Sequence, residues 1–85
     1  MEFKNRLKDL REDDDLKQKE VAEKINIHQT TLSKYELGTI DIPTNVLKSL
    51  AHFYNTSIDY ILCETDDPRP YKKKEVRKWK LHQLK

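Results

Sequence analysis

Apolar residues recur along the chain three or four positions apart, in short runs separated by polar turns. The first run is Phe3, Leu7 and Leu10, and its spacing predicts one apolar helix face that continues to about Glu12. Three aspartates follow at positions 13–15. Because Asp tolerates left-handed backbone, this triplet can end the helix where a glycine would normally stand.

Two further helices follow, with only a very short turn between them. The stretch LKQKEVAEKI has its apolar side chains on one side and ends at Asn26, which can adopt a left-handed turn conformation. A third helix is predicted from about Gln29 to Leu37. It ends at Gly38, the only glycine in the chain and the expected C-terminal cap.

The last two helices are predicted at about residues 43–54 and after Ser57. Asn55 ends the first of them, and Ser57 is the expected N-cap of the second. The inward-facing side chains of the first are Val46, Leu47, Leu50, Ala51 and Tyr54. The second carries Ile58, Ile61 and Leu62.

Composition supports a small all-α protein. The chain has 85 residues, of which 35% are hydrophobic and 38% charged, which favours short amphipathic helices and one modest core. No apolar run is long enough to span a bilayer, and the first residues lack the apolar core of a signal peptide, so we expect a cytoplasmic protein that does not enter a membrane. The lone Cys63 is interpreted as a buried or half-buried reduced thiol.

Charge divides the chain at Thr65. Residues 1–65 carry nine Lys and Arg against twelve Asp and Glu, a formal charge of −3, whereas residues 66–85 carry eight against three, a charge of +5. The stretch ETDDPRPYKKK marks this change in composition and predicts the end of the domain.

Two short helices joined by so tight a turn predict a helix-turn-helix, in which the second helix enters the DNA major groove with its N-terminus first. This gives the polar first turn of the helix at residues 29–37 a purpose. The small Ala22 lets the two helices approach closely. The apolar seam between them is formed by Val21, Ile25, Ile27, Leu32 and Tyr35.

The stretch LKQKEVAEKINIHQTTLSKYELG resembles the lambda-repressor-like, or Xre-type, helix-turn-helix family. DIPTNVLKSLAHFYNTSIDYIL is similar to helices 4 and 5 of its small bacterial and phage members. The resemblance covers about residues 3–65. It implies a compact five-helix DNA-binding domain in residues 1–65, followed by a basic C-terminal extension in residues 66–85 that could contain a further helix.

The resemblance also implies a function. We expect sequence-specific binding of double-stranded DNA and regulation of transcription, with repression as the expected sign. Members usually bind palindromic operators as two-fold dimers. Helix 5 and the extension are the expected dimer surface, with Tyr60 and Ile61 as contacts, although Ile61 could equally belong to the core.

Carried over to this chain, the resemblance assigns DNA contacts to the starts of the second and third helices. Gln18 would bond a phosphate and brace Gln29, which would read a base. A Gln can form two hydrogen bonds with adenine, a Thr can offer a methyl group to thymine, and a Lys can reach guanine or a phosphate. The predicted DNA-binding residues are Lys17, Gln18, Lys19, His28, Gln29, Thr30, Thr31, Ser33 and Lys34. Arg11 and Glu36 are implied to form a partly buried structural pair.

The basic extension allows two interpretations. It could be a disordered solubilising segment. Alternatively, Val76, Trp79 and Leu84 fall near one helical face with lysines and arginines around it, which predicts a basic amphipathic helix. Such a helix could contact DNA phosphates or a second subunit, or an anionic membrane.

Other functional classes find little support in the sequence. His28, His52 and His82 are too far apart for a metal-ligand motif, and there is no glycine-rich phosphate loop. We therefore expect no enzyme activity, metal, cofactor or small-molecule ligand. The remaining alternative is a protein-interaction or antitoxin-like module in which DNA binding is secondary.

Overall fold

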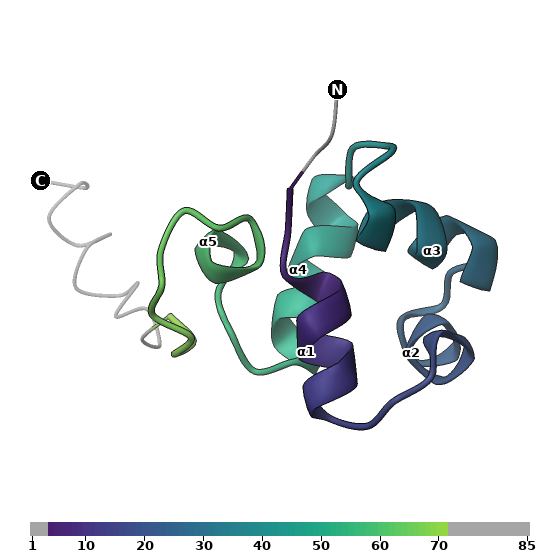
Figure 1. Cartoon of the computed structure of the whole chain (residues 1–85), viewed down its shortest axis with the longest axis horizontal. Helices are drawn as coiled ribbons and strands as arrows, with labels where there is room; N and C mark the ends of the chain where they lie inside the picture. The colour runs from purple at the N-terminus through teal and green to yellow at the C-terminus, as the bar shows by residue number, and fades with distance from the viewer. Residues whose placement is uncertain (1–3, 72–85) are drawn as a thin grey trace, which may run out of the picture.

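The computed structural model describes residues 4–71, and this part of the chain contains five helices and no strand. The helices are α1 (Leu7–Asp13), α2 (Gln18–Ile25), α3 (Gln29–Leu37), α4 (Thr44–Phe53) and α5 (Ile58–Ile61). Figure 1 shows α2 and α3 at one end of the molecule and α5 toward the other, with α1 and α4 between them. The all-α, five-helix fold predicted from the sequence is confirmed.

The first helix begins later than its apolar spacing predicted. The backbone N–H of Arg6 donates to the carbonyl of Ile61 at 2.8 Å, and the side-chain Oδ1 of Asn5 accepts from the N–H of Leu7 at 3.0 Å. These bonds hold residues 5 and 6 outside the helix, so α1 starts at Leu7. Phe3, the first apolar residue of the predicted face, lies outside the described residues.

Each of the five helices ends in the same way. A residue with left-handed backbone follows the helix, and the N–H of the next residue donates to the carbonyl five positions earlier, at 2.8–3.1 Å. This bond satisfies a carbonyl that the helix end would otherwise leave without a partner. The left-handed residues, with φ between 52° and 74°, are Asp15, Asn26, Gly38, Asn55 and Cys63.

The core confirms the predicted seam between α2 and α3. Ile25 and Ile27 pack at its edge. A fully buried leucine or isoleucine side chain contributes about 1.5–3 kcal/mol to the stability of the fold relative to an exposed one. The buried apolar residues are Leu7, Val21, Ala22, Leu32, Tyr35, Ile42, Leu50, Ala51 and Ile61.

The two residues expected at a dimer contact have different environments. Ile61 is 0% exposed and belongs to the core, so its assignment as a subunit contact is wrong. Tyr60 is half-buried, and the Arg6 guanidinium lies over its ring with Cζ 4.2 Å from the centroid. Tyr60 therefore already has a stacking partner, Arg6, within its own chain.

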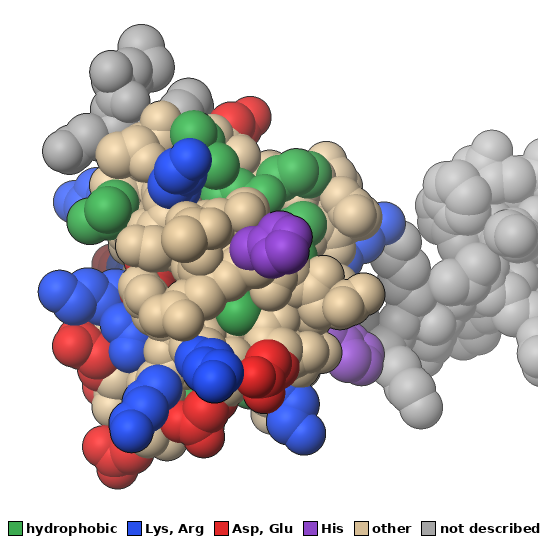
Figure 2. Space-filling model, turned by 90° about the vertical axis from the view of Figure 1, so that its right-hand side faces the viewer, with side chains coloured by type: hydrophobic (Ala, Val, Ile, Leu, Met, Phe, Trp, Pro, Cys, Tyr) green, Lys and Arg blue, Asp and Glu red, His purple; other side chains and the backbone are tan. Residues whose placement is uncertain are grey.

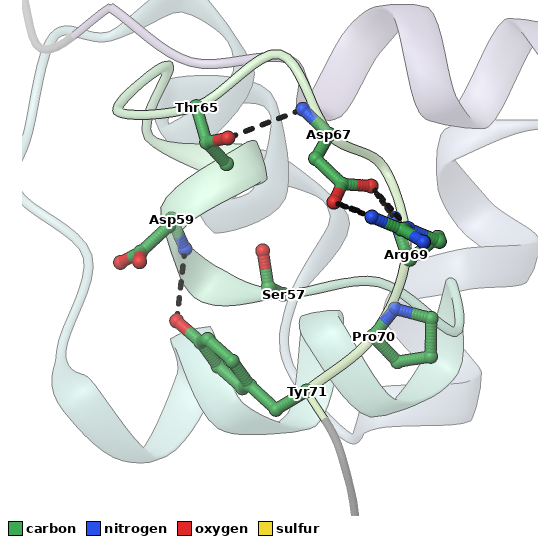
Figure 3. Close-up of a pocket in the computed structure, with 7 residues that line it drawn as sticks. All are labelled: Ser57, Asp59, Thr65, Asp67, Arg69, Pro70 and Tyr71. Atoms are coloured by element: carbon green, nitrogen blue, oxygen red, sulfur yellow. Dashed lines mark hydrogen bonds and ion pairs between the residues drawn. The ribbon is translucent and has the colours of Figure 1, made fainter.

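Residues 65–71, called here the C-terminal strap, pack back onto the fold. The hydroxyl of Thr56 donates to the carbonyl of Pro68 at 2.7 Å, and the hydroxyl of Tyr71 accepts from the N–H of Asp59 at 3.3 Å. Figure 3 shows the strap and α5 on either side of a pocket of about 490 Å³. Contacts thus continue to Tyr71, past the predicted boundary at Thr65, while residues 72–85 lie outside the described part.

Within the strap, Asp67 and Arg69 form an exposed ion pair (Figure 3). The Arg69 guanidinium donates to both carboxylate oxygens, at 2.7–3.1 Å. This side-chain contact, together with a bond from the Arg69 N–H, lowers the pKa of Asp67 to about 2. Asp67 therefore keeps its charge, and with it the local turn of the strap, at an acidic pH at which an ordinary aspartate is protonated.

Arg6 connects the start of the fold to its end. Its Nη1 donates to the carbonyls of Tyr60 and Thr65 at 2.6 and 2.8 Å, and its Nη2 contacts Asp66 Oδ1 at 2.7 Å. The Asp66 side chain is fully exposed, so this ion pair adds little stability. The hydrogen bonds from Arg6 to the carbonyl groups of Tyr60 and Thr65 connect the two ends of the fold, and they satisfy backbone acceptors near the end of α5.

Candidate nucleic-acid interface

The turn between α2 and α3 is built from local signals in the sequence. Asn26 takes left-handed backbone (φ 61°), and the N–H of Ile27 closes the end of α2 on the carbonyl of Ala22 at 3.0 Å. His28 is extended (φ −72°, ψ 144°), and α3 starts at the next residue. The chain therefore reverses within very few residues, as a helix-turn-helix requires.

The first turn of α3 is polar and open to solvent. His28, Gln29 and Thr30 are exposed, and the side chain of His28 does not cap the helix. The first intrahelical bond is donated by Leu32 to the carbonyl of His28, so the N–H groups of the preceding turn have no helical partner. Such a helix start attracts phosphate and other anions.

The sequence-predicted residues fall at the starts of α2 and α3 and along the exposed side of α3. Lys17, Lys19 and Lys34 are exposed, as are the residues at the start of α3. Gln18, Thr31 and Ser33 are half-buried. Figure 2 looks onto the end of the molecule that carries α2 and α3. A His side chain lies near its centre, hydrophobic side chains lie mostly above it, Lys and Arg side chains are distributed around the edge, and Asp and Glu lie mostly toward the lower edge.

The lysines of this surface are available to a ligand. Among residues 4–71, the ion pairs are Arg6–Asp66, Arg11–Glu36 and Arg69–Asp67, and none of these includes a lysine. Lys17 is the N-cap of α2, where its backbone N–H donates to Glu20 Oε1 at 2.9 Å, so its ammonium group is not needed for capping.

The expected contact between Arg11 and Glu36 is present and bidentate. Arg11 Nε donates to Glu36 Oε2 at 2.8 Å, and Arg11 Nη2 donates to Glu36 Oε1 at 3.1 Å. Arg11 Nη1 also donates to the carbonyl of Leu16 at 2.9 Å. The hydrogen bond to Glu36 raises the pKa of the Arg11 guanidinium. The pair links α1 to the last turn of α3.

Gln18 is placed differently from the expectation. Its amide Nε2 donates to Glu36 Oε1 at 3.0 Å, and Gln29 makes no side-chain hydrogen bond within residues 4–71. The bracing of Gln29 by Gln18 is therefore not part of this unliganded structure. The contact between Gln18 and Glu36 could not be predicted, because partners eighteen positions apart leave no local pattern in the sequence.

Two apolar residues extend the exposed side of α3, and the sequence analysis did not assign them. Leu37 is 66% exposed and lies one helical turn beyond Lys34 and two beyond Thr30. Ile40, in the following turn, is 38% exposed. The spacing of Leu37, seven residues after Thr30 and three after Lys34, is the sequence signal that places it on the same helix face.

The structure bears on two other predicted absences only within the part that it describes. No helix between residues 4 and 71 is long and apolar enough to cross a membrane. The same segment holds no group of three His, Cys, Asp or Glu side chains that could ligate a metal ion.

Two short helices packed through a buried seam, with an exposed polar turn at the start of the second, define a helix-turn-helix domain. The sequence profile of the family described as "Helix-turn-helix" matches residues 7–61 of this chain. The chain therefore belongs to the helix-turn-helix family, in its lambda-repressor-like branch, as the resemblance implied.

Curated relatives include regulators from two bacteria. The chain is 42% identical over 65 residues to the uncharacterised HTH-type transcriptional regulator YobD, and 44% identical over 62 residues to the HTH-type transcriptional regulator ImmR, both of Bacillus subtilis (strain 168). It is 33% identical over 64 residues to the cryptic phage CTXphi transcriptional repressor RstR of Vibrio cholerae. These matches cover 73–76% of this chain but only 49–58% of the relatives. The chain thus spans about half the length of the relatives it matches.

Proposed function

We propose that this chain binds double-stranded DNA in a sequence-specific manner and regulates transcription, with repression as the expected sign. The observation that carries the proposal is the exposed polar first turn of α3, held by the buried seam with α2 at the start of a recognition helix. The names of the relatives, two regulators and a phage repressor, support the same function.

In this proposal, the residues at the starts of α2 and α3 make two kinds of DNA contact. Gln29, Thr30, Ser33 and Lys34 read base edges in the major groove, while Gln18, Lys17, Lys19 and the two helix N-termini hold phosphates. His28 and Thr31 flank the reading positions. Arg11 and Glu36 fix the angle of α3 against α1.

Selection from a random pool of duplex DNA tests the function. The full chain should enrich one sequence, and the enriched duplex should bind at least about 10³-fold more tightly than unrelated DNA at the same salt concentration. A chain that enriches no sequence, but co-purifies stoichiometrically with another protein, would instead support the antitoxin-like alternative.

Substitution of the reading residues tests the assignment. Gln29→Ala and Lys34→Ala should each cost about 1–3 kcal/mol of binding and relax preference at one base pair, because each removes a contact to a base edge. The control is Lys8→Ala, which removes an exposed lysine of α1 outside the proposed set. Full base preference in both test variants, measured by competition with single-base-changed duplexes, would refute the assignment.

We also propose that the protein binds as a homodimer on two half-sites about 34 Å apart, because one recognition helix reads only a few base pairs. The expected subunit surface is α5 with the residues that follow it, where Tyr60 remains a candidate contact and Ile61 does not. Light scattering of the complex should give two chains per duplex. One chain per duplex, at saturating protein, would rule this arrangement out.

The basic extension is proposed to add phosphate contacts or to support the dimer. Truncation after Tyr71 removes residues 72–85 and leaves the strap in place. If the removed residues contact phosphates, the slope of log affinity against the logarithm of the salt concentration should become shallower by about one to three units, while the base preference stays unchanged. If they support the dimer, affinity should instead depend steeply on protein concentration. An unchanged slope, affinity and stoichiometry would leave only a solubilising role.

A further inference from the structure

The carboxylate of Glu36 receives hydrogen bonds from two other helices. Its side chain lies near the end of α3 and is only 3% exposed. Oε2 accepts from Arg11 Nε, whereas Oε1 accepts both from Arg11 Nη2 at 3.1 Å and from Gln18 Nε2 at 3.0 Å. Glu36 therefore joins α1 and the first residue of α2 to the recognition helix.

These contacts fix the direction of the Gln18 amide. A carboxylate has only acceptors, so only the Nε2 end of the amide can face it. The carboxylate itself cannot turn away, because Arg11 holds both of its oxygens and is tied in turn to the carbonyl of Leu16 at 2.9 Å. Gln18 therefore keeps its Oε1 and its second N–H for partners other than Glu36.

We propose that Glu36 is a positioning residue for base recognition, acting by fixing the orientation of the Gln18 amide. This inference rests on the proposed function, and it adds that Gln18, besides holding a phosphate, braces Gln29 once DNA is bound. With its Nε2 held by Glu36, Gln18 offers Oε1 to an N–H of Gln29 and so orders the Gln29 amide as well.

An ordered amide at Gln29 discriminates between the two purines. Adenine presents an acceptor at N7 and a donor at N6, which match one N–H and the carbonyl oxygen of a single glutamine. Guanine presents two acceptors, N7 and O6, and an amide held in one orientation matches only one of them. Glu36 thus favours adenine over guanine while it stays buried and makes no contact with DNA.

The test removes Glu36 without leaving a charge stranded. In the double variant Arg11→Met/Glu36→Leu both ionic partners become apolar residues of similar size, an exchange that buried ion pairs often tolerate. The matched control is Arg11→Lys, which weakens the bidentate pair but keeps the carboxylate and its bond to Gln18. Thermal melts followed by circular dichroism verify that both variants fold.

The readout is the affinity ratio between adenine and guanine at one position of the selected duplex, identified as the position whose preference disappears in Gln29→Ala. The double variant should lower this ratio about tenfold, while Arg11→Lys should keep it. A purely structural role for Glu36 would move stability in both variants and the ratio in neither.

A second measurement needs no DNA and no substitution. In amide spectra of the unliganded full chain, one side-chain N–H of Gln18 should exchange with solvent markedly more slowly than those of Gln29. Equally fast exchange of both Gln18 protons, or an unchanged purine ratio in a folded double variant, overturns the inference alone. A wild-type chain that selects no DNA sequence overturns the proposed function and this inference with it, although the exchange data still decide how Gln18 is held.

Discussion

At the scale of single residues, Tyr54 is the least satisfied group in the described part of the chain. Its ring packs edge-on against Phe53, with centroids 4.9 Å apart, and its hydroxyl is buried without a hydrogen-bond partner among residues 4–71. A buried polar atom without a partner loses its hydration and gains nothing in return. Tyr54 therefore stabilises the fold through the packing of its ring and not through its hydroxyl.

Removing this hydroxyl should not harm the fold. We expect Tyr54→Phe to leave the free energy of unfolding unchanged or to raise it by up to about 1 kcal/mol, because the substitution keeps the ring and deletes the unsatisfied atom. Urea unfolding at pH 7 measures the effect. Tyr60→Phe is the control on a half-buried tyrosine. A loss of more than about 1 kcal/mol in Tyr54→Phe would mean that the hydroxyl has a partner in solution.

The same side chain predicts a pH dependence. Burial, and then the nearby charge of Glu36, raise the pKa of Tyr54 well above its usual value. Above about pH 10, the unfolded state releases the Tyr54 proton while the folded state keeps it, so unfolding becomes easier as the pH rises. Above about pH 10, wild type should therefore lose stability with rising pH more steeply than Tyr54→Phe. Parallel curves for the two proteins would contradict the prediction.

At the scale of elements, the helices could be predicted because their signals are local. Apolar spacing and the turn residues Asn26, Gly38 and Asn55 act over a few positions, and the structure uses all three in left-handed backbone. Cys63 was not predicted to have left-handed backbone, because cysteine has no preference for this conformation. The start of α1 was placed too early, because a distant contact with Ile61 decides it.

The common helix ending predicts that one turn can be improved. Asp15 is exposed and has φ 55°, a conformation that glycine adopts without the penalty of a Cβ atom. We expect Asp15→Gly to raise the free energy of unfolding by about 0.5–1 kcal/mol. Asp13→Gly has the same charge change but lies at the last residue of α1, where the backbone is still helical, so it should not stabilise the fold. Thermal melts giving the same sign for both variants would show that charge, and not backbone conformation, dominates.

At the scale of the whole molecule, the division of the chain at Thr65 followed from composition, whereas the contacts continue to Tyr71. The strap and the Arg6 contacts could not be predicted, because their partners lie 12 to 60 positions apart and hydrogen bonds to backbone carbonyls require no particular residue type. The exposed face of α3 could be anticipated, because it depends on one helix and one turn. The orientation of Gln18 could not, since three helices determine it together.

Two truncations separate the strap from the basic residues beyond it. A chain ending at Tyr71 keeps the described contacts of the strap and is the reference. A chain ending at Thr65 should lose about 1–3 kcal/mol, because it lacks the bonds of Thr56 to Pro68 and of Asp59 to Tyr71. Equal stability of the two truncated chains would mean that the strap contributes nothing to the fold.

The Arg6 contacts also determine when the protein can finish folding during its synthesis. Arg6 precedes α1, yet its partners, the carbonyls of Ile61, Tyr60 and Thr65, follow it by 54 to 59 positions. On the ribosome, α2 and α3 can pair as soon as they emerge, whereas the segment before α1 must wait until α5 has left the exit tunnel. Stalled nascent chains should accordingly resist protease at residues 4–13 only when residues beyond Thr65 are outside. The pair of α2 and α3 is thus assembled before α5 and the strap complete the fold around it.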